Sequence, residues 1–215
     1  MTFNPIILEN WERKEYFNYY LNQQTTFSMT TDIEISSFKA AIKRKGYKFY
    51  PTFIYIVTEV INANESFRIS FNEEGKLGYW EKLIPLYTVF DDQKQSFSNL
   101  WTESTSNVLT FQEDYDRDVV EYNHMGGLFP KTPIPANTFP ISMIPWNSFS
   151  GFNLNVGDGG NFLLPIITAG KYYSKATATY LPVSLQVHHA VCDGYHAASF
   201  LNQLQELANT TNEWL

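Results

Sequence analysis

The chain has 215 residues, of which 44% are hydrophobic and 17% charged, and its net charge is −7. This length is enough for one domain with a sizeable core, so we expect a single domain over residues 1–215. The negative charge and the lack of a long Lys or Arg run argue against nucleic acid or an anionic membrane as a partner. Aromatic residues make up 17% of the chain, which indicates large buried surfaces or aromatic-lined pockets.

The N-terminal sequence and the cysteine count indicate a cellular compartment. The first ten residues lack the basic segment and long apolar run of a signal peptide. No apolar run approaches the length that spans a membrane. Cys192 is the only cysteine, so an intrachain disulfide is impossible. We therefore expect a cytoplasmic protein.

Hydrophobic periodicity and turn residues divide the chain into helices and strands. The first predicted elements are a helix over 11–20 with Asn10 as its N-cap, a strand over 27–35, a helix capped by Ser36 or Ser37 that ends at Gly46, and an apolar helix up to residue 61 with Pro51 in its first turn. A hairpin of two strands over 67–71 and 77–80, a strand over 86–90 and a helix over 108–122 follow. The last predicted elements are strands over 139–145, 152–156, 162–169 and 177–187 and a helix over 195–207.

These elements predict an α+β fold. We expect a two-layer sandwich, in which helices pack mainly on one side of a large mixed β-sheet. The glycine-rich run at 157–160 is predicted to be a turn. No predicted helix follows it, so it does not match a phosphate-binding loop.

Residues 181–194, with the sequence LPVSLQVHHAVCDG, are the most informative stretch. Apolar residues alternate up to Val187, which predicts a strand with one buried face. This alternation places His189 on the buried side and His188 on the opposite side. A histidine on an apolar face is most often a core residue with satisfied hydrogen bonds. An imidazole held at the end of a core strand also suits proton transfer near neutral pH.

Two other chemistries are conceivable in the same stretch. His188, His189, Asp193 and His196 are close in sequence, so a metal site is one alternative. The strand alternation separates the two adjacent histidines, which argues against chelation, and we expect no metal. Cys192 could act as a nucleophile, but nothing marks it as a low-pKa thiol, so we expect it to pack in the core.

The stretch resembles the His-His-x-x-x-Asp-Gly motif of the coenzyme A-dependent acyltransferase superfamily. With the flanking Gln186-Val187 and Tyr195-His196, the resemblance narrows to the chloramphenicol acetyltransferase family. It extends over nearly the whole chain, because further landmarks of that family occur in the same order. These landmarks are Trp11, Arg13-Lys14-Glu15, Tyr47-Lys48-Phe49-Tyr50-Pro51, Phe97-Ser98, Leu128-Phe129-Pro130, Ile141-Ser142-Met143-Ile144-Pro145-Trp146, Phe152-Asn153-Leu154-Asn155-Val156 and Pro165-Ile166-Ile167-Thr168.

The resemblance implies acetyl transfer from acetyl-CoA to the primary hydroxyl of chloramphenicol, directly and without an acyl-enzyme, which inactivates the antibiotic. His189 matches the general base of the family, and Ser142 matches the donor to the tetrahedral oxyanion. Thr168 matches a position that binds an ordered water near the same oxyanion. Asp193 matches the partner of an arginine, here Arg13, in a structural ion pair at the site.

The resemblance also implies binding positions and an assembly. Acetyl-CoA is expected as a cosubstrate, with no tightly bound cofactor. A homotrimer is expected, with active sites at subunit interfaces, so that His189 and much of the acceptor pocket come from different subunits. The matching acceptor-binding positions are Tyr19, Tyr20, Phe97, Phe129, Leu154 and Val156, and the matching CoA-binding positions are Trp146, Lys171 and Tyr172.

The sequence departs from the family pattern at residues 23–26, near the expected pocket, which leaves the preference among acceptors open. Two alternatives to the implied function remain. A dihydrolipoyl acyltransferase core shares the histidine motif but usually belongs to a longer chain with a lipoyl domain. A protein that binds the antibiotic without turnover is the other alternative, and the presence of both His189 and Ser142 argues against it.

Overall fold

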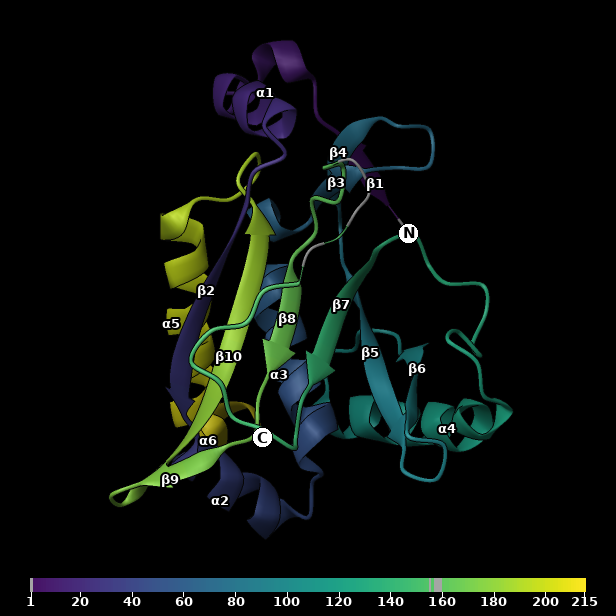
Figure 1. Ribbon diagram of the computed structural model, residues 1–215, viewed down its shortest axis with the longest axis vertical. Coiled ribbons are helices and arrows are strands. Elements are labelled where there is room, and N and C mark those ends of the chain that lie inside the picture. The colour runs from purple at the N-terminus through teal and green to yellow at the C-terminus, as the bar shows by residue number, and fades with distance from the viewer. Residues whose placement is uncertain (1, 155, 157–159) are drawn as a thin grey trace.

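The computed structural model describes residues 2–154, 156 and 160–215. A seven-stranded sheet forms its centre, with the strand order β2-β10-β8-β7-β5-β6 and with β9 paired to β10 (Figure 1). The sheet is mixed, because β7 runs parallel to both β5 and β8 while the other pairs are antiparallel. Its strands are β2 (Thr26–Glu34), β5 (Ile84–Asp91), β6 (Ser96–Trp101), β7 (Thr138–Met143), β8 (Ile166–Ala169), β9 (Tyr173–Lys175) and β10 (Ala178–His188).

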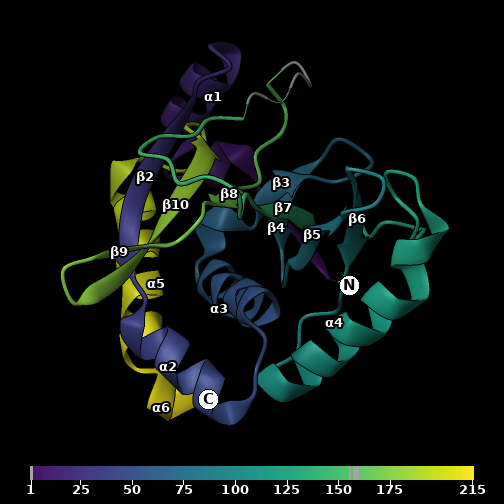
Figure 2. The ribbon, with the colours of Figure 1, turned by 60° about the horizontal axis from the view of Figure 1, so that its bottom comes forward.

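Helices cover one face of this sheet. Figure 2 shows α3, α4 and α5 on the same side, so the predicted α+β class with a large mixed sheet is confirmed. Within the described residues, no helix is long and apolar enough to cross a membrane. The helices are α1 (Lys14–Asn22), α2 (Ser36–Lys45), α3 (Phe49–Ala63), α4 (Val108–Tyr122), α5 (Gly194–Asn209) and α6 (Thr211–Trp214).

A second, three-stranded sheet has the order β1-β4-β3, with β1 at Phe3–Pro5, β3 at Ile69–Phe71 and β4 at Leu77–Trp80. The predicted hairpin is confirmed, because β3 and β4 pair antiparallel around a turn in which the side chain of Asn72 accepts two backbone hydrogen bonds. The β1 strand is too short to show alternation. Its approach requires Gly78, where an added Cβ would lie 2.4 Å from the carbonyl oxygen of Asn4.

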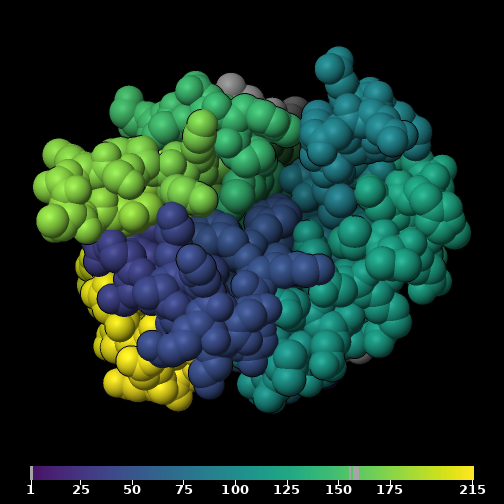
Figure 3. Space-filling model, turned by 90° about the horizontal axis from the view of Figure 1, so that it is seen from below, coloured from purple at the N-terminus to yellow at the C-terminus, as the bar shows by residue number. Residues whose placement is uncertain are grey.

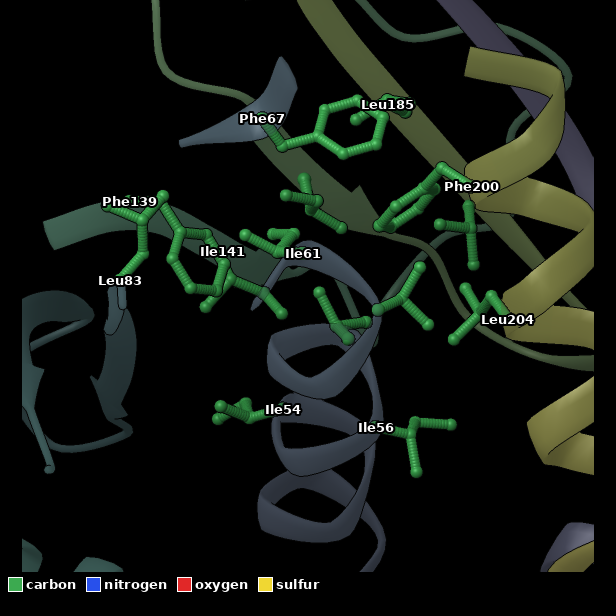
Figure 4. Packing of buried hydrophobic residues seen from close by; sticks show 14 of the residues in the cluster. Ile54, Ile56, Ile61, Phe67, Leu83, Phe139, Ile141, Leu185, Phe200 and Leu204 are labelled. Atoms are coloured by element: carbon green, nitrogen blue, oxygen red, sulfur yellow. The ribbon is translucent and has the colours of Figure 1, made fainter. Parts of the chain in front are cut away.

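The core lies between the sheet and α3. This helix is buried around most of its circumference, as expected for a helix packed between a sheet and other helices. In Figure 4, Ile61 of α3 lies beside Ile141 of β7, and Phe200 and Leu204 of α5 project toward the same core. Burial of each such side chain stabilises the fold by about 1.5–3 kcal/mol.

Two predicted helix starts are wrong. Leu8–Asn10 form a short 3₁₀ helix, so Asn10 does not cap α1, which begins at Lys14. Ile35 occupies the N-cap position of α2, and the hydroxyl of Ser36 instead accepts a hydrogen bond from the backbone of Thr179. At α2 a tertiary contact therefore takes the hydroxyl that would have formed the local cap. The predicted end of α2 at Gly46 is confirmed, with φ at +74°.

The strand predictions also need correction. β6 and β9 are strands that the sequence pattern does not predict, and β8 is shorter than the predicted strand over 162–169. Residues 152–154 and 156 form no strand, and Asn155 lies outside the described residues. Of the predicted turn at 157–160, only Gly160 is described, in a turn with positive φ.

The prediction that β10 has one buried face is wrong. Its odd positions are buried in the helical layer, but Ser184, Gln186 and His188 on the other face are buried as well. A segment after β7 crosses that face: the Ser184 hydroxyl donates to the carbonyl of Phe152, and the backbone of Leu154 donates to the side chain of Gln186. His188 is therefore buried, while His189, one residue past the strand, is only half-buried.

Candidate active site

Arg13 holds the backbone around His189. The His189 amide donates to the carbonyl of Thr25 at 2.8 Å. The Arg13 Nη2 donates to the His189 carbonyl at 3.1 Å, and its Nε donates to the Ala190 carbonyl at 2.9 Å. The remaining nitrogen, Nη1, lies 3.1 Å from Asp193 Oδ2 in an ion pair. A planar guanidinium suits this arrangement because its donors have fixed relative directions.

The imidazole of His189 is fixed by aromatic contacts. It stacks on the ring of Tyr20, with centroids 3.8 Å apart and planes 3° apart, and the ring of Phe27 meets it edge-on at 5.2 Å. Its Nδ1 is buried and has no hydrogen-bond partner among the described residues. One ring face is therefore covered by Tyr20, and the orientation of the ring is set by packing and by the backbone.

Asp193 links this histidine to α5. Its Oδ1 accepts hydrogen bonds from the backbone nitrogens of Tyr195 and His196, which caps the helix. Partial burial works to raise the pKa of Asp193. Hydrogen bonds from Arg13 and His196 outweigh that effect and hold the pKa below its ordinary value. Asp193 is therefore ionised at neutral pH.

A cavity of about 620 Å³ lies along β5, β7 and β8, and Tyr50 of α3 and Tyr115 of α4 also line it. The lining is mostly apolar, with a few polar groups. Its residues are Tyr50, Leu86, Thr88, Val89, Phe90, Phe97, Asn99, Tyr115, Pro140, Ile141, Ser142, Met143, Ile144, Pro145, Trp146, Phe152, Leu154, Ile166 and Thr168.

Ser142 and Thr168 form the polar centre of this cavity. They are direct partners on the parallel strands β7 and β8, and their hydroxyl oxygens lie 3.3 Å apart. Tyr50 reaches the same strand, with its hydroxyl 3.4 Å from the Ile141 carbonyl. Burial raises the pKa of Tyr50, so its hydroxyl keeps its proton. The cavity thus offers hydroxyl donors within an apolar wall, as ligand pockets generally do.

His189 and Ser142 lie far apart within one chain. Ser142 pairs with Thr168, and Thr168 pairs with Ser184 of β10. His189 follows Ser184 by five positions, which corresponds to about 17 Å along an extended strand. In Figure 1, β10 runs upward toward α1, whereas β7 and β8 run downward. His189 is also not among the described residues that line the cavity.

The other sequence-predicted residues fall into two groups. Phe97, Leu154 and Trp146 line the cavity, and all three are substantially exposed. Tyr20 contacts His189, and Tyr19 contacts Tyr20 edge-on. The residues outside the cavity lining are Tyr19, Tyr20, Phe129, Val156, Lys171 and Tyr172, as far as the described part of the chain defines that lining.

Tyr172 directly precedes β9 and contacts α2 and α3, at the end of the molecule where β9 and α2 lie in Figure 1. Its ring centroid lies 5.7 Å from that of Phe49, and the Nζ of Lys39 sits 3.8 Å above the ring. Figure 3 views this end from below, where the blue segments of α2 and α3 lie beside the light-green region around β9. The ends of β7 and β8 point toward the same side in Figure 1.

Sequence reasoning missed several groups at the site. Tyr50 and Thr88 line the cavity, and His196 contacts Asp193. The alternate positions Leu86, Thr88 and Phe90 in β5 were the sequence pattern that could have indicated the cavity residues of this strand. That pattern did not reveal that these residues line a cavity, because that depends on how distant segments of the chain pack together.

Two alternative chemistries have little support from the geometry. Within residues 2–154, 156 and 160–215, no group of three or more His, Cys, Asp or Glu side chains is placed to hold a metal ion. Cys192 is buried, and burial raises the pKa of its thiol well above the ordinary value. A thiol in that state is a poor nucleophile.

Comparison with known proteins places the fold and the family. The model of a family described as chloramphenicol acetyltransferase matches residues 1–205. A chloramphenicol acetyltransferase from Staphylococcus aureus is 57% identical over 215 residues, which is 100% of both chains.

Solved structures share the fold. A chloramphenicol acetyltransferase structure has a TM-score of 0.83 at 20% identity, over 96% of this chain and 100% of the other. A dihydrolipoamide acetyltransferase from Azotobacter vinelandii has a TM-score of 0.68 at 14% identity, over 91% and 88% of the two chains. Because the sequence identities to these two structures are low, the similarity establishes only the fold. On the family match and the full-length identity, the chain belongs to the chloramphenicol acetyltransferase family and is an acyltransferase.

Proposed function

We propose that this enzyme transfers the acetyl group of acetyl-CoA to the primary hydroxyl of chloramphenicol and so inactivates the antibiotic. The observation that carries the proposal is the full-length identity of 57% to a protein of that name, in a chain that has both His189 and Ser142. The apolar cavity with hydroxyl groups at its centre supports an aromatic, uncharged acceptor.

His189 is the proposed general base. An alcohol is a weak nucleophile until its proton is removed as the new bond forms. The imidazole takes that proton while the hydroxyl oxygen attacks the thioester carbonyl carbon. Stacking on Tyr20 and the Arg13 contact to the backbone keep the ring in one orientation. Such positioning reduces the entropy lost on the way to the transition state.

Ser142 is the proposed oxyanion donor. Attack on the thioester gives a tetrahedral intermediate whose oxygen carries a negative charge. The Ser142 hydroxyl donates to that oxygen, and Thr168 holds a water that donates to it as well. Their neighbouring hydroxyls, 3.3 Å apart, are close enough to serve one oxyanion. Collapse of the intermediate forms the acetyl ester and expels the CoA thiolate, which recovers the proton from the imidazolium.

The proposed transfer is direct, without an acyl-enzyme. Cys192 is too buried and too weakly acidic to carry the acetyl group. In its own chain, Ser142 has Thr168 as its hydroxyl partner and lies far from His189. A serine without an adjacent base is a poor nucleophile.

A homotrimer completes the proposed site. His189 and Ser142 belong to different ends of one chain, so a site that uses both requires a second copy. The exposed aromatic residues Phe90, Phe97 and Trp146 at the cavity are the kind of surface that a neighbouring subunit covers. Closed cyclic symmetry would give every copy the same contact, with His189 of one subunit reaching the cavity of the next.

The binding positions follow from this arrangement. The acceptor lies among residues of both subunits, and acetyl-CoA enters from the end of the molecule where Tyr172 and Lys171 lie. Trp146, which lines the cavity and is exposed, is the third proposed CoA-binding residue. The proposed acceptor-binding residues are Tyr19, Tyr20, Phe97, Phe129, Leu154 and Val156.

The first experiment measures CoA thiol release from acetyl-CoA with and without chloramphenicol. We expect acceptor-dependent release from the wild-type enzyme and none above background from His189→Ala. We expect Ser142→Ala to bind both substrates but to lose about 10²–10³ in kcat. Tight binding of the antibiotic without release would instead indicate a sequestering protein. Neither binding nor release would indicate another acceptor.

A further inference from the structure

On the basis of the proposed function, we propose that His196 is a positioning residue for the general base His189. It touches neither the imidazole of His189 nor the cavity in the described structure. Its effect passes through Asp193 and Arg13 to the backbone that carries His189.

The first step of this pathway is the contact between His196 and Asp193. The His196 Nδ1 lies 2.9 Å from Asp193 Oδ1 and 3.2 Å from the Asp193 backbone nitrogen. An ionised carboxylate only accepts hydrogen bonds. Nδ1 cannot accept the Asp193 N–H and donate to Oδ1 at the same time. Without a proton it accepts the backbone N–H and completes a capping box, and with a proton it donates to Oδ1. The proposed coupling operates in the form in which Nδ1 carries the proton. His196 fixes one carboxylate oxygen in this way and leaves the other for Arg13.

The second step is the geometry of Arg13. Its Nη1 pairs with Asp193 Oδ2, while Nη2 and Nε donate to the carbonyls of His189 and Ala190. Because the guanidinium is rigid, a rotation of the carboxylate changes all three contacts together. A change at His196 is thus transmitted to the peptide unit of His189, and a misplacement of about 1 Å at a reacting group costs up to 10²-fold in rate.

If His196 served only to cap α5, its removal would have a different effect from the one proposed. The N-terminus of α5 keeps a cap without this side chain, because Asp193 Oδ1 also accepts from the backbone nitrogens of Tyr195 and His196. Removal of the imidazole should therefore leave α5 folded. We expect removal of the imidazole to lower the rate of proton transfer selectively. Removal of a residue that only stabilises the helix would not have this selective effect.

The kinetic test compares His196→Ala and His196→Asn with Asn202→Ala, an exposed position on the same helix. We expect His196→Ala to lower kcat about tenfold while both KM values stay within about twofold. Asparagine should restore most of kcat, because its amide nitrogen occupies nearly the place of Nδ1. Asn202→Ala should match the wild type. Unchanged kcat in His196→Ala, or a failure of asparagine to rescue it, would overturn the proposal.

A double-mutant cycle tests the route. If His196 acts through Asp193, then His196→Ala should cause no further loss of kcat in an Asp193→Ala background. Independent, multiplicative losses would show that the two residues act separately and would contradict the proposal.

A third measurement does not depend on turnover. The chain has only four histidines, so their ring proton signals in NMR can be assigned with His189→Ala as the reference. We expect the His189 signal to shift in His196→Ala and not in Asn202→Ala. If the His189 signal shifts in His196→Ala but the wild type shows no acceptor-dependent CoA release, the proposed function is refuted. The structural coupling between His196 and His189 is then still supported. An unmoved His189 signal would refute the coupling.

Discussion

Tyr20 and His189 stack face to face, with ring centroids 3.8 Å apart and an interplanar angle of 3°. The sequence resemblance assigned Tyr20 to acceptor binding, but in the folded chain its ring covers one face of the proposed base. We therefore predict separable roles for the two parts of Tyr20: the ring affects the rate, and the hydroxyl affects the affinity for the acceptor.

Tyr20→Phe keeps the stacked ring, so we expect kcat to stay within about twofold of the wild type. Tyr20→Ala removes a contact worth about 0.5–1.5 kcal/mol, which corresponds to a loss of about 2–10-fold in kcat if the stack orients the base. Steady-state kinetics with varied chloramphenicol separate the two effects. Equal kcat values for Tyr20→Ala and the wild type would exclude an orienting role for the ring.

Mixing two inactive variants tests the shared site. We expect His189→Ala and Ser142→Ala homo-oligomers each to have little activity. If each site takes His189 and Ser142 from different subunits, unfolding and refolding an equal mixture should restore about a quarter of the sites. The control is the same mixture without refolding, which should stay inactive. No recovery after subunit exchange would show that both residues act within one chain or that the assembly is different.

Asp193 should make the stability depend on pH in a defined window. Its pKa in the folded protein is held below the ordinary value, so its stabilising effect is present above the unfolded pKa of about 3.9 and is lost as the pH falls through the folded pKa. Urea unfolding of the wild type and Asp193→Asn should therefore show a constant difference from pH 7 to pH 5. That difference should shrink below about pH 4, and an undiminished difference at pH 3 would argue against the ionised pair.

Lys131 and Asp118 form a buried ion pair that holds the segment after α4. The Nζ of Lys131 lies 2.6 Å from Asp118 Oδ1 and 3.9 Å above the ring of Trp101, and both partners are less than 15% exposed, at 13% and 10%. Asp118 also accepts from the Thr102 hydroxyl. The pair therefore connects α4, β6 and the loop that carries Phe129.

We expect Lys131→Met to lower the free energy of unfolding by about 3–5 kcal/mol, because it leaves a buried carboxylate without its cation. The matched control is Arg117→Met, which breaks the more exposed Arg117–Asp114 pair on α4 and should cost less than about 1 kcal/mol. Both values come from urea unfolding curves. Similar small losses for the two variants would mean that Asp118 is rescued by other donors.

The local sequence was sufficient for elements whose signals are short in range. The helix over Val108–Tyr122, the hairpin of β3 and β4, and the end of α2 at Gly46 follow from periodicity, turn residues and a left-handed glycine. Helix starts were less predictable, because Arg13 and Ser36 use their side chains in contacts with residues far along the chain.

By itself, the sequence determined the family, the α+β class and the residues that carry the proposed chemistry, because motifs and periodicity are properties of neighbouring positions. Only the tertiary structure decided which residues line the cavity, that His188 is buried, and that Tyr20 stacks on His189. It also separated His189 from Ser142 by five positions along β10 and beyond its end, and connected His196 to Arg13 through one carboxylate. These relationships depend on strand register and on packing between distant segments, which no local pattern encodes.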